Sequence, residues 1–518
     1  MAAKVYFYSL VSAPGRRTIC ILKIKELRQQ LVRNLLFVLI VNLLVKAVWI
    51  FCIDRNVQIQ VGYADYGTYQ ALFNLGIIFQ ILLDFGMTHY NGREIARDPG
   101  RIRTVFSSML WARLILVAVY MLLVSGIALV AGYTGWKLEL LAGVLLIQAL
   151  TAMLLFLRSN VAALQYFKTD GVLAVTDRLL MILVCGVLLL FPAWAGHFRI
   201  GWFVWAQVAC YGLAVIAAFI VLLRISPFAI GFSFRPRIIR AVMVRSMPYA
   251  LLVFLMSLYT RSDSVLIERL CGADGAVQAG IYASAFRLLD VANIFGIMFA
   301  GILLPMFASM LAKKESVAAL IRTSVNIMMP VAFIAAVAAV LFSDDVMQLL
   351  YHKARNGADS RIFALLLCSF PAYCLMYIYS TLLTANGSIR LLNRISLLLV
   401  LVNIGLNVWG IPLYYATAAA YSSLVTEWLA AALVIYQVHR LFRLPHNYRW
   451  LAAHLGFALA LVLAGTGVVR LPLDRLQQFI CYAAIAGILL FVFRFWTLAS
   501  FRELMKAKAA PAPSAEAP

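Results

Sequence analysis

The sequence predicts an all-α polytopic membrane protein with about 14 transmembrane helices and both termini in the cytoplasm. The first observation is composition: 64% of the 518 residues are hydrophobic and 13% are charged, whereas soluble domains are ~45–50% apolar and ~25% charged. The second is the recurrence of long apolar segments, and the third is the placement of Lys and Arg between them. A soluble core could not bury this much apolar surface, so lipid must be the solvent for most of the chain.

Each predicted span follows from its length, because about 20 apolar residues cross the hydrocarbon core of a bilayer. The segments that meet this condition lie at about 31–53, 68–90, 104–131, 139–158, 171–192, 202–223, 248–268, 280–311, 325–350, 361–385, 395–415, 417–438, 450–471 and 478–500. The connection near residue 416 is so short that 12 or 13 spans also fit. No connection is long enough to hold a soluble catalytic domain.

The net charge of +23 follows from this topology. With the N-terminus inside, 29 of the 44 Lys and Arg residues fall in cytoplasmic segments and nine in outer loops, as the positive-inside rule predicts. On a soluble protein the same charge would suggest nucleic-acid binding. Here it needs no nucleic acid, and membrane lipids are the expected partners of the basic surface.

The spans are predicted to form a pair of six-helix bundles followed by two extra helices. The predicted units are a basic cytoplasmic lead (1–28), an N-terminal bundle (29–224), a cytoplasmic linker (225–247), a C-terminal bundle (248–440), two extra helices (441–500) and a disordered cytoplasmic tail (501–518). The basic residues of the lead follow its short apolar stretch, which is the reverse of the order in a cleavable signal peptide.

A short motif recurs where the second helix of each bundle begins. "VGYADYGTYQALF" and "DGAVQAGIYASAF" share the pattern G-x4-G-x-Y-x3-F when Gly62 is aligned with Gly275. We interpret the motif as an outer turn whose glycines permit a tight re-entry, with its tyrosines at the membrane interface. The residues assigned to this repeated turn are Gly62, Gly67, Tyr69, Gly275, Gly280 and Tyr282. Bundles with an even number of spans would be parallel repeats, as in several transporter folds.

Two basic residues lie inside the first helix of the two bundles. Lys46 lies about two-thirds of the way through the first span, and Arg261 lies about as far through the seventh. A charge at this depth costs several kcal/mol, so it usually faces a bundle interior or a wet cavity. We expect Lys46 and Arg261 to face each other across a central cavity that binds a pyrophosphate group. The alternative is that Lys46 snorkels to the outer interface and Arg261 forms a structural ion pair.

Polar and acidic residues at similar depth could balance these cations or couple an ion to transport. They are Asn74, Asp84, Asp263, Asp290 and Glu427. Arg113, Arg178 and Arg287 lie nearer the span ends, and we interpret them as structural. The eight Cys and six His residues have neither disulfide nor metal-ligand spacing. Since nucleotide-binding and hydrolase motifs are also absent from the sequence, we expect no cofactor, no metal and no enzymatic activity.

The opening region resembles the Wzx-type polysaccharide flippases of the multidrug/oligosaccharidyl-lipid/polysaccharide exporter superfamily. The likeness is carried by "VGYADYGTYQALF", by "LLDFGM" at the end of the second span and by the loop "NGREIA". "YTRSDSVLIERL" and "AGIYASAFRLLDV" are similar to the second half of the family. The resemblance implies a MATE-like fold of two six-helix bundles, often with two extra C-terminal helices. It also implies a cationic central cavity, which agrees with Lys46 and Arg261.

The resemblance further implies a function. Such flippases move oligosaccharide repeat units linked to undecaprenyl pyrophosphate from the inner to the outer leaflet of the bacterial cytoplasmic (inner) membrane. The units then enter O-antigen (lipopolysaccharide), capsule or exopolysaccharide assembly, with a polysaccharide polymerase and a chain-length regulator as further partners. Two alternatives stay open. A MATE-type cation or drug antiporter would use the buried acids, and a membrane-embedded polysaccharide polymerase or ligase would need a larger outer domain than these loops provide.

Overall fold

The computed structural model describes residues 45, 48–98, 100, 102–190, 196, 198–226, 236–352, 357–444 and 447–495. Within these ranges the regular structure is entirely helical. The predicted lead, the predicted tail and most of the first predicted span lie outside the described residues. Lys46 is among the residues that the structure does not describe, so its proposed role stays a prediction.

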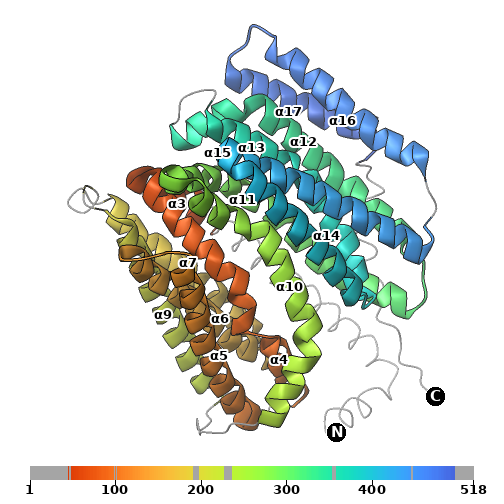
Figure 1. Ribbon diagram of the computed structural model, residues 1–518. Helices are drawn as coiled ribbons and strands as arrows, with labels where there is room; N and C mark the ends of the chain where they lie inside the picture. The colour runs from red at the N-terminus through yellow and green to blue at the C-terminus, as the bar shows by residue number, and fades with distance from the viewer. Residues whose placement is uncertain are drawn as a thin grey trace, which may run out of the picture.

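The first half of the described chain runs from a π-helical turn to the helix before the linker. Its elements are η1 (Trp49–Asp54), α3 (Arg55–Phe79), η2 (Gln80–Leu83), α4 (Met87–Arg97), α5 (Ile102–Val130), α6 (Trp136–Ala163), α7 (Phe167–Leu190) and α9 (Ile200–Ile225). Figure 1 shows α5, α6, α7 and α9 gathered into one bundle, with α3 along its inner side.

The second half begins with α10 and forms another bundle. Its elements are α10 (Pro236–Leu270), η4 (Gly272–Asp274), α11 (Gly275–Ala312), α12 (Ala318–Tyr351), α13 (Ala358–Cys368), α14 (Phe370–Ala385) and α15 (Ile389–Phe442). Two further helices, α16 (Tyr448–Val469) and α17 (Arg475–Val492), follow. Figure 1 shows these last two against α12 at the edge of the molecule that faces away from the first half.

Helix α15 must fold back on itself. Its 54 residues would extend ~80 Å as one straight helix, far more than the ~30 Å hydrocarbon core. The helix breaks at Tyr415, where φ is 55°. Asn407 and Ser423, on the two sides of this break, both donate hydrogen bonds to the Asp263 carboxylate. The two arms therefore run back alongside each other, and they correspond to the predicted spans 395–415 and 417–438.

Buried apolar side chains form one large core in each half. One core joins buried residues from Trp49 to Val242, and the other joins residues from Leu252 to Val438. A third, small core attaches α16 and α17 to the second half through Phe342 of α12. The extra helices therefore pack on one bundle and take no part in the contact between the two halves. The boundaries of the predicted units stay predictions.

The two halves meet most closely where α3 crosses α11. A Cβ atom on Gly67 would lie 2.5 Å from the amide nitrogen of Gly280 and would overlap the carbonyl oxygen of Ala276. A Cβ atom on Gly280 would overlap the carbonyl oxygen of Tyr63. Only glycine lets the two backbones approach this far. The crossing joins the halves at the end of the molecule that the charge distribution assigns to the outside, which we call the outer end.

Polar contacts reinforce this closure of the outer end. Lys137 and Tyr133 of the first half lie 2.7 and 3.0 Å from the Glu268 carboxylate of α10. Burial raises the pKa of the Tyr133 hydroxyl, which keeps it protonated as a donor to Glu268. The Tyr63 hydroxyl likewise donates to Asp359 at the start of α13. These contacts hold the outer ends of the two bundles together.

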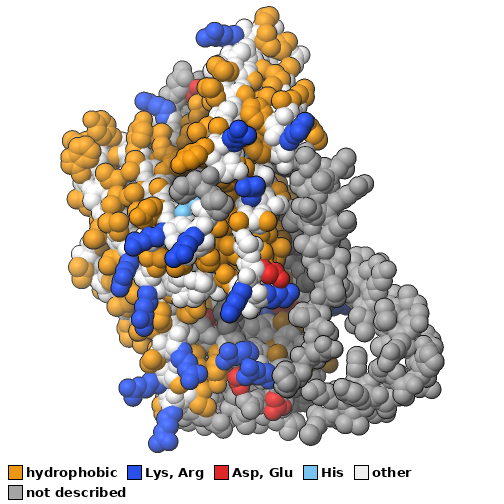
Figure 2. All heavy atoms as spheres, turned by 90° about the vertical axis from the view of Figure 1, so that its right-hand side faces the viewer, with side chains coloured by type: hydrophobic (Ala, Val, Ile, Leu, Met, Phe, Trp, Pro, Cys, Tyr) orange, Lys and Arg blue, Asp and Glu red, His pale blue; other side chains and the backbone are white. Residues whose placement is uncertain are grey.

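The chain is a multi-pass membrane protein. Eleven helices of the described residues are long and apolar enough to cross a membrane. This number is lower than the 14 predicted spans partly because the two arms of α15 count as one helix. In addition, the predicted second span is divided among α3, η2 and α4, so it is not counted as one long helix. Figure 2 shows one face on which hydrophobic side chains predominate and basic side chains are commoner than acidic ones. The total of 14 spans and the location of the termini stay predictions.

Candidate functional site

The candidate site lies where α3, α10 and α11 bring the two halves together. Arg261 of α10 binds Asp290 of α11 through two hydrogen bonds of 3.1 and 3.2 Å. Its guanidinium also lies 5.1 Å from the centre of the Phe286 ring. This bidentate pair within the second half matches the structural alternative considered for Arg261. Asp290 is the acid that neutralises it.

A second arginine reaches from one half to the other. Arg287 of α11 lies 3.0 Å from the carboxylate of Asp54, which is 3% exposed in the π-helical turn of the first half. Arg287 also donates to the Tyr66 hydroxyl at 3.3 Å and to the Gln70 side-chain oxygen at 3.2 Å. The Tyr66 hydroxyl in turn donates to Asp54 at 2.9 Å. Four polar side chains thus form one buried network across the contact between the halves.

This network borders a partly enclosed polar cavity of about 240 Å³. Arg178 of α7 and Arg287 supply positive charge, and Asp54 supplies the opposite charge. Gln207 also lines the cavity; it is 4% exposed, and its amide nitrogen has no hydrogen-bond partner in the described part of the chain. Further polar side chains around the cavity are Gln80, Gln148, Thr151, Tyr69 and Tyr211. Arg178 lies 3.6 Å from the Asp177 carboxylate of its own helix, so both arginines have an acidic partner. The two guanidinium groups and the unused amide donor of Gln207 make the cavity suited to an anionic or hydroxyl-rich group that competes with these partners.

Asp263 lies deep in the second half and binds only neutral donors. It is 1% exposed, and it accepts hydrogen bonds from Tyr282 at 2.7 Å, from Asn407 at 2.8 Å and from Ser423. Among the described residues no Lys or Arg forms an ion pair with it. The side-chain oxygen of Asn407, the amide nitrogen of Asn403 and the hydroxyl of Thr426, all on α15, have no hydrogen-bond partner among the described residues.

Glu427 is the other buried acid of the second half. It is 2% exposed, and the tyrosines Tyr373, Tyr259 and Tyr377 surround it. A carboxylate among neutral hydroxyls has donors but no neutralising cation. Glu427 and Asp263 are thus two acids of one bundle whose charge is not balanced by an ion pair in the described structure.

Asp84 and Asn74 occupy different places from this cluster. Asp84 binds Arg113, and it also caps α4 by accepting from the Thr88 amide at 3.0 Å. Arg113 is 1% exposed and donates to the Ala152 carbonyl oxygen at 2.6 Å. Asn74 crosses between the halves, because its amide donates to the Ser264 hydroxyl at 3.0 Å. Asp84 therefore stabilises the start of α4 within the first half. Asn74, in contrast, lies in the contact between the halves.

The repeated motif has a different role from the one its sequence suggests. Gly67 and Gly280 are inside helices, at the close crossing of α3 and α11, rather than in turns. Of the four repeat glycines, only Gly62, with φ of 80°, adopts the left-handed conformation expected of a turn glycine. Gly275 begins α11 after the short η4 turn.

The interpretation of the repeat tyrosines as interfacial is wrong, because Tyr69 and Tyr282 are 2% and 1% exposed. Each packs on the phenylalanine four residues later, Phe73 or Phe286, with ring centres 5.7 and 5.6 Å apart. In addition, the Tyr282 hydroxyl binds Asp263. Since the pattern Y-x3-F places both rings on one helix face, it is a packing motif of the interior.

Asp54, Arg178, Arg287 and Gln207 are site residues that sequence reasoning missed or judged structural. The sequence places Asp54 directly after the first predicted span, where a carboxylate normally faces water. The only local signal is this position of a single acid at the end of an apolar segment. The pairing of Asp54 with Arg287, which belongs to the other half of the chain, has no local signature in the sequence.

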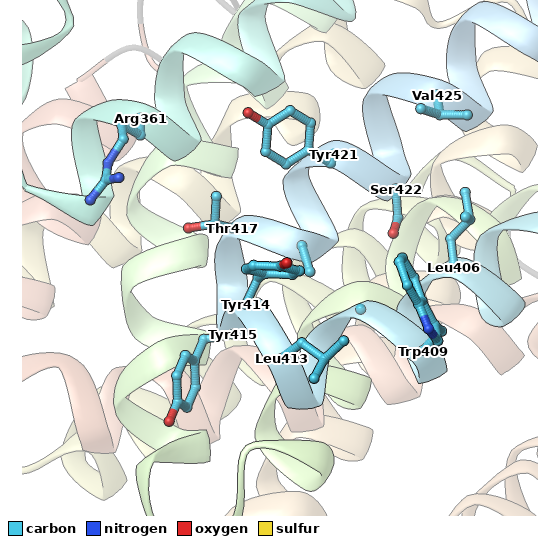
Figure 3. A pocket seen from close by; sticks show the side chains of 12 residues that line it. Arg361, Leu406, Trp409, Leu413, Tyr414, Tyr415, Thr417, Tyr421, Ser422 and Val425 are labelled. Carbon is cyan, nitrogen blue, oxygen red and sulfur yellow. The ribbon is translucent and has the colours of Figure 1, made fainter.

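A larger hollow of about 520 Å³ lies at the tip of the α15 hairpin. Figure 3 shows the side chains of Trp409, Tyr414 and Tyr421 projecting from α15 around it, with Arg361 of α13 at its edge. Trp409 and Tyr414 are 68% and 64% exposed. Exposed Trp and Tyr at the end of a spanning helix are typical of the membrane interface. We therefore assign this hollow to the interface and not to the polar site.

Comparison with known proteins identifies both a family and a fold. The family described as "Polysaccharide biosynthesis protein" matches residues 31–311, which include the network residues from Asp54 to Arg287. No curated protein sequence matches the chain significantly. The resemblance to polysaccharide flippases inferred from the sequence is thus confirmed at the level of the family.

Solved structures similar to the chain include a flippase and multidrug transporters. The lipid II flippase MurJ in an inward closed conformation has a TM-score of 0.64 at 12% identity and covers 89% of this chain and 99% of its own. An inward-facing multidrug resistance MATE family transporter has 0.57 at 12%, with coverages of 75% and 94%. A mutant of the Vibrio cholerae MATE transporter VcmN has 0.55 at 16%, with coverages of 80% and 98%. At these identities the likeness shows the fold, and it confirms the predicted MATE-like architecture.

Proposed function

Because this chain belongs to the polysaccharide biosynthesis protein family, we propose that it is a flippase for oligosaccharide repeat units linked to undecaprenyl pyrophosphate. It carries them from the inner to the outer leaflet of the bacterial cytoplasmic membrane for O-antigen, capsule or exopolysaccharide assembly. The observation that carries the proposal is the polar cavity lined by Arg178, Arg287 and Gln207 beside the contact between the halves. A charged, hydrated headgroup cannot cross hydrocarbon unaided, and such a cavity replaces its water.

The residues around the cavity suit the two parts of the headgroup. Guanidinium groups bind phosphate oxygens with paired hydrogen bonds, so Arg178 and Arg287 would hold the pyrophosphate. The amide of Gln207, whose nitrogen has no partner among the described residues, could donate to a sugar hydroxyl. Lys46, three residues before Trp49 in the sequence, would add a further cation. Arg261 would join the site if its pair with Asp290 opened.

Rocking of the two halves would expose the cavity to each side of the membrane in turn. The outer end is closed by the crossing of Gly67 and Gly280 and by Lys137 with Glu268. For the substrate to leave outward, these contacts and the Arg287–Asp54 pair must separate. Access from the inner side is consistent with the inward-facing transporters that share the fold, and it forms the second part of the proposal.

The acids of the second half would couple an ion to this cycle. Asp263 lacks a neutralising cation in the described structure, and the side-chain oxygen of Asn407, whose amide donates to Asp263, has no donor among the described residues. A proton on Asp263, or a small monovalent cation beside it, would balance the carboxylate. Glu427 provides a second site for a proton, while Asp290 and Asp84 are already paired with arginines. A polysaccharide polymerase and a chain-length regulator would act on the translocated unit.

A MATE-type cation or drug antiporter is the second candidate. The buried acids Asp263 and Glu427 favour it, since a cationic substrate would seek uncompensated carboxylates. The two guanidinium groups that line the cavity favour the flippase instead, because they can bind phosphate oxygens. Polymerase or ligase activity has no support from the arrangement of the described residues at the outer end, where short connections join the helices.

The test is complementation of a strain that lacks this protein. Arg178→Gln should abolish surface polysaccharide and cause the lipid-linked unit to accumulate on the inner leaflet, with normal protein levels, because the cavity loses a phosphate ligand. Arg178→Lys should retain part of the function. Arg199→Gln, an exposed outer arginine, is the control and should complement fully. Full complementation by Arg178→Gln, or export of cationic drugs by the wild type, would contradict the flippase proposal.

A further inference from the structure

A second pocket lined by arginines lies at the opposite end of the molecule from the closed outer contacts. It measures about 550 Å³ and lies between the start of α4 and the first turns of α10. Its polar lining consists of Arg93, Arg237, Arg245, Tyr90 and Ser246. The charge distribution assigns this end to the cytoplasm, whereas the polar cavity described above lies at the contact between the halves.

The helices themselves make the arginines converge. Arg237 and Arg245 are eight residues apart on α10, so they lie on one face about 12 Å apart along the axis, with the small Ala241 between them. Gly86, with φ of 76°, allows α4 to begin against α10, where a Cβ atom would lie 2.7 Å from the Ser246 hydroxyl oxygen. Helix α4 then brings Arg93 to the other wall of the pocket.

These three arginines lack the acidic partners that other arginines at this end possess. Arg97 lies 3.7 Å from Glu94, and Arg158 lies 2.9 Å from Asp170. Among the described residues no carboxylate lines the pocket, and none of its three arginines forms an ion pair. All three are exposed, so solvent screens their mutual repulsion, and an anion in the hollow would offset what remains. Guanidinium groups favour the oxygens of a phosphate or diphosphate.

The surface beyond the pocket is apolar. Along α10, Val244 is 65% exposed directly before Arg245, and Met247 and Tyr249 are 55% and 50% exposed in the turn after it. A ligand with an anionic head and a hydrocarbon tail would match this sequence of surfaces, because its head would lie in the pocket and its tail along α10 in the lipid. A free phosphate would use only the first of them.

We propose that this pocket is a reception site that binds the diphosphate headgroup of a polyprenyl lipid at the inner leaflet before the headgroup enters the cavity between the halves. The inference rests on the proposed function and adds to it a first binding step, with its own residues. Arg93, Arg237 and Arg245 hold the diphosphate oxygens, and the Tyr90 and Ser246 hydroxyls lie within the same pocket.

The test uses the purified full chain in phosphatidylcholine nanodiscs, with geranylgeranyl diphosphate as the probe. The variant Arg93→Gln/Arg237→Gln/Arg245→Gln should raise the Kd at least tenfold. The matched control Arg224→Gln/Arg240→Gln/Arg390→Gln removes the same charge from exposed arginines that do not line the pocket, and it should change the Kd less than twofold. Equal losses in the two triple variants, or no loss in either, would overturn the proposal.

Competition separates the possible sources of the phosphate. Inorganic diphosphate should compete at least tenfold more weakly than the prenyl diphosphate, because it lacks the tail. If phosphatidylglycerol added to the nanodisc abolishes probe binding at equal mole fraction, the pocket is a general site for anionic lipids and the proposal is overturned. The binding result stands apart from complementation, so a failure of the proposed flippase function would be recognised separately.

Discussion

Asp54 and Asp263 are two buried acids, one in each half, with opposite electrostatic surroundings. Both are nearly inaccessible, at 3% and 1% exposed, and each accepts a tyrosine hydroxyl, at 2.9 and 2.7 Å. Asp54 is neutralised by Arg287 from the other half. Among the described residues, Asp263 accepts hydrogen bonds from neutral donors of its own half. The difference indicates that Asp54 ties the two halves together, whereas Asp263 is free to change its charge without separating them.

The largest expected effect comes from breaking the charged tie. Asp54→Ala leaves Arg287 buried without its carboxylate, and the loss of one partner of a buried pair costs ~3–5 kcal/mol. Thermal unfolding of the purified protein in detergent should shift markedly, and the yield from membranes should fall. Asp54→Ala/Arg287→Met should recover much of the stability, because no charge is then left unpaired. A double variant as unstable as the single one would show that Arg287 does not depend on Asp54.

The corresponding change in the second half should act on function instead. Asp263→Asn keeps the size of the side chain and removes no partner of an ion pair, so the unfolding temperature should change by only a few degrees. Transport should fall at least tenfold and lose its dependence on pH or on the coupling cation. Asp274→Asn, at an exposed acid of η4, is the control and should behave as wild type. Unchanged transport by Asp263→Asn would remove Asp263 from the coupling site.

A substitution at a backbone crossing should also affect the surroundings of Asp54 and Asp263 differently. Gly280→Ala introduces a Cβ that overlaps the Tyr63 carbonyl oxygen, so the outer crossing must widen and weaken the nearby Arg287–Asp54 tie. Thiol labelling of Tyr63→Cys should increase severalfold in this background, while the Asp263 cluster stays intact. Gly301→Ala, on the same helix with open space around it, should leave labelling unchanged. Equal labelling in both variants would argue against closure by this crossing.

The smallest expected effect concerns the two tyrosines. A hydrogen bond to a charged group contributes ~1.5–3 kcal/mol. The loss of unfolding free energy in Tyr282→Phe should fall within this range, because no cation among the described residues pairs with Asp263 to replace the lost donor. Tyr66→Phe should cost less, since Asp54 retains Arg287. Unfolding of the two variants under identical conditions measures the difference, and a greater loss from Tyr66→Phe would reverse the ranking of the two acids.

Several features could be predicted from the sequence because they depend on local composition. The helical membrane architecture follows from the length of the apolar segments, and the predicted pair near 395–438 corresponds to the two arms of α15. The repeat that aligns Gly62 with Gly275 is visible in the sequence, but its purpose is not. A glycine pattern shows where the backbone carries no side chain. It does not show whether glycine is needed there for a turn or for close packing against another helix.

The candidate site was harder to predict, because the sequence does not show which neighbour each side chain contacts. The depth of Arg261 singles it out in the sequence, yet the structure pairs it with Asp290, whereas Arg287, judged structural, joins the two halves. Depth along a helix is a property of the sequence, but the direction in which a side chain points depends on how the bundle is rotated. The cavity around Arg178 and Gln207 therefore appears only when α7 and α9 are placed beside η1.

The sequence by itself determined the solvent of this protein, its helical class and its family, because hydrophobicity and motif spacing are written along the chain. Only the tertiary structure decided which charges are compensated. Asp54 forms an ion pair with an arginine from the opposite half of the chain, and Asp263 forms none in the described structure, although the sequence places Arg261 only two residues before Asp263. Ion pairing requires a separation of a few ångströms in space, and the packing of the helices sets that separation.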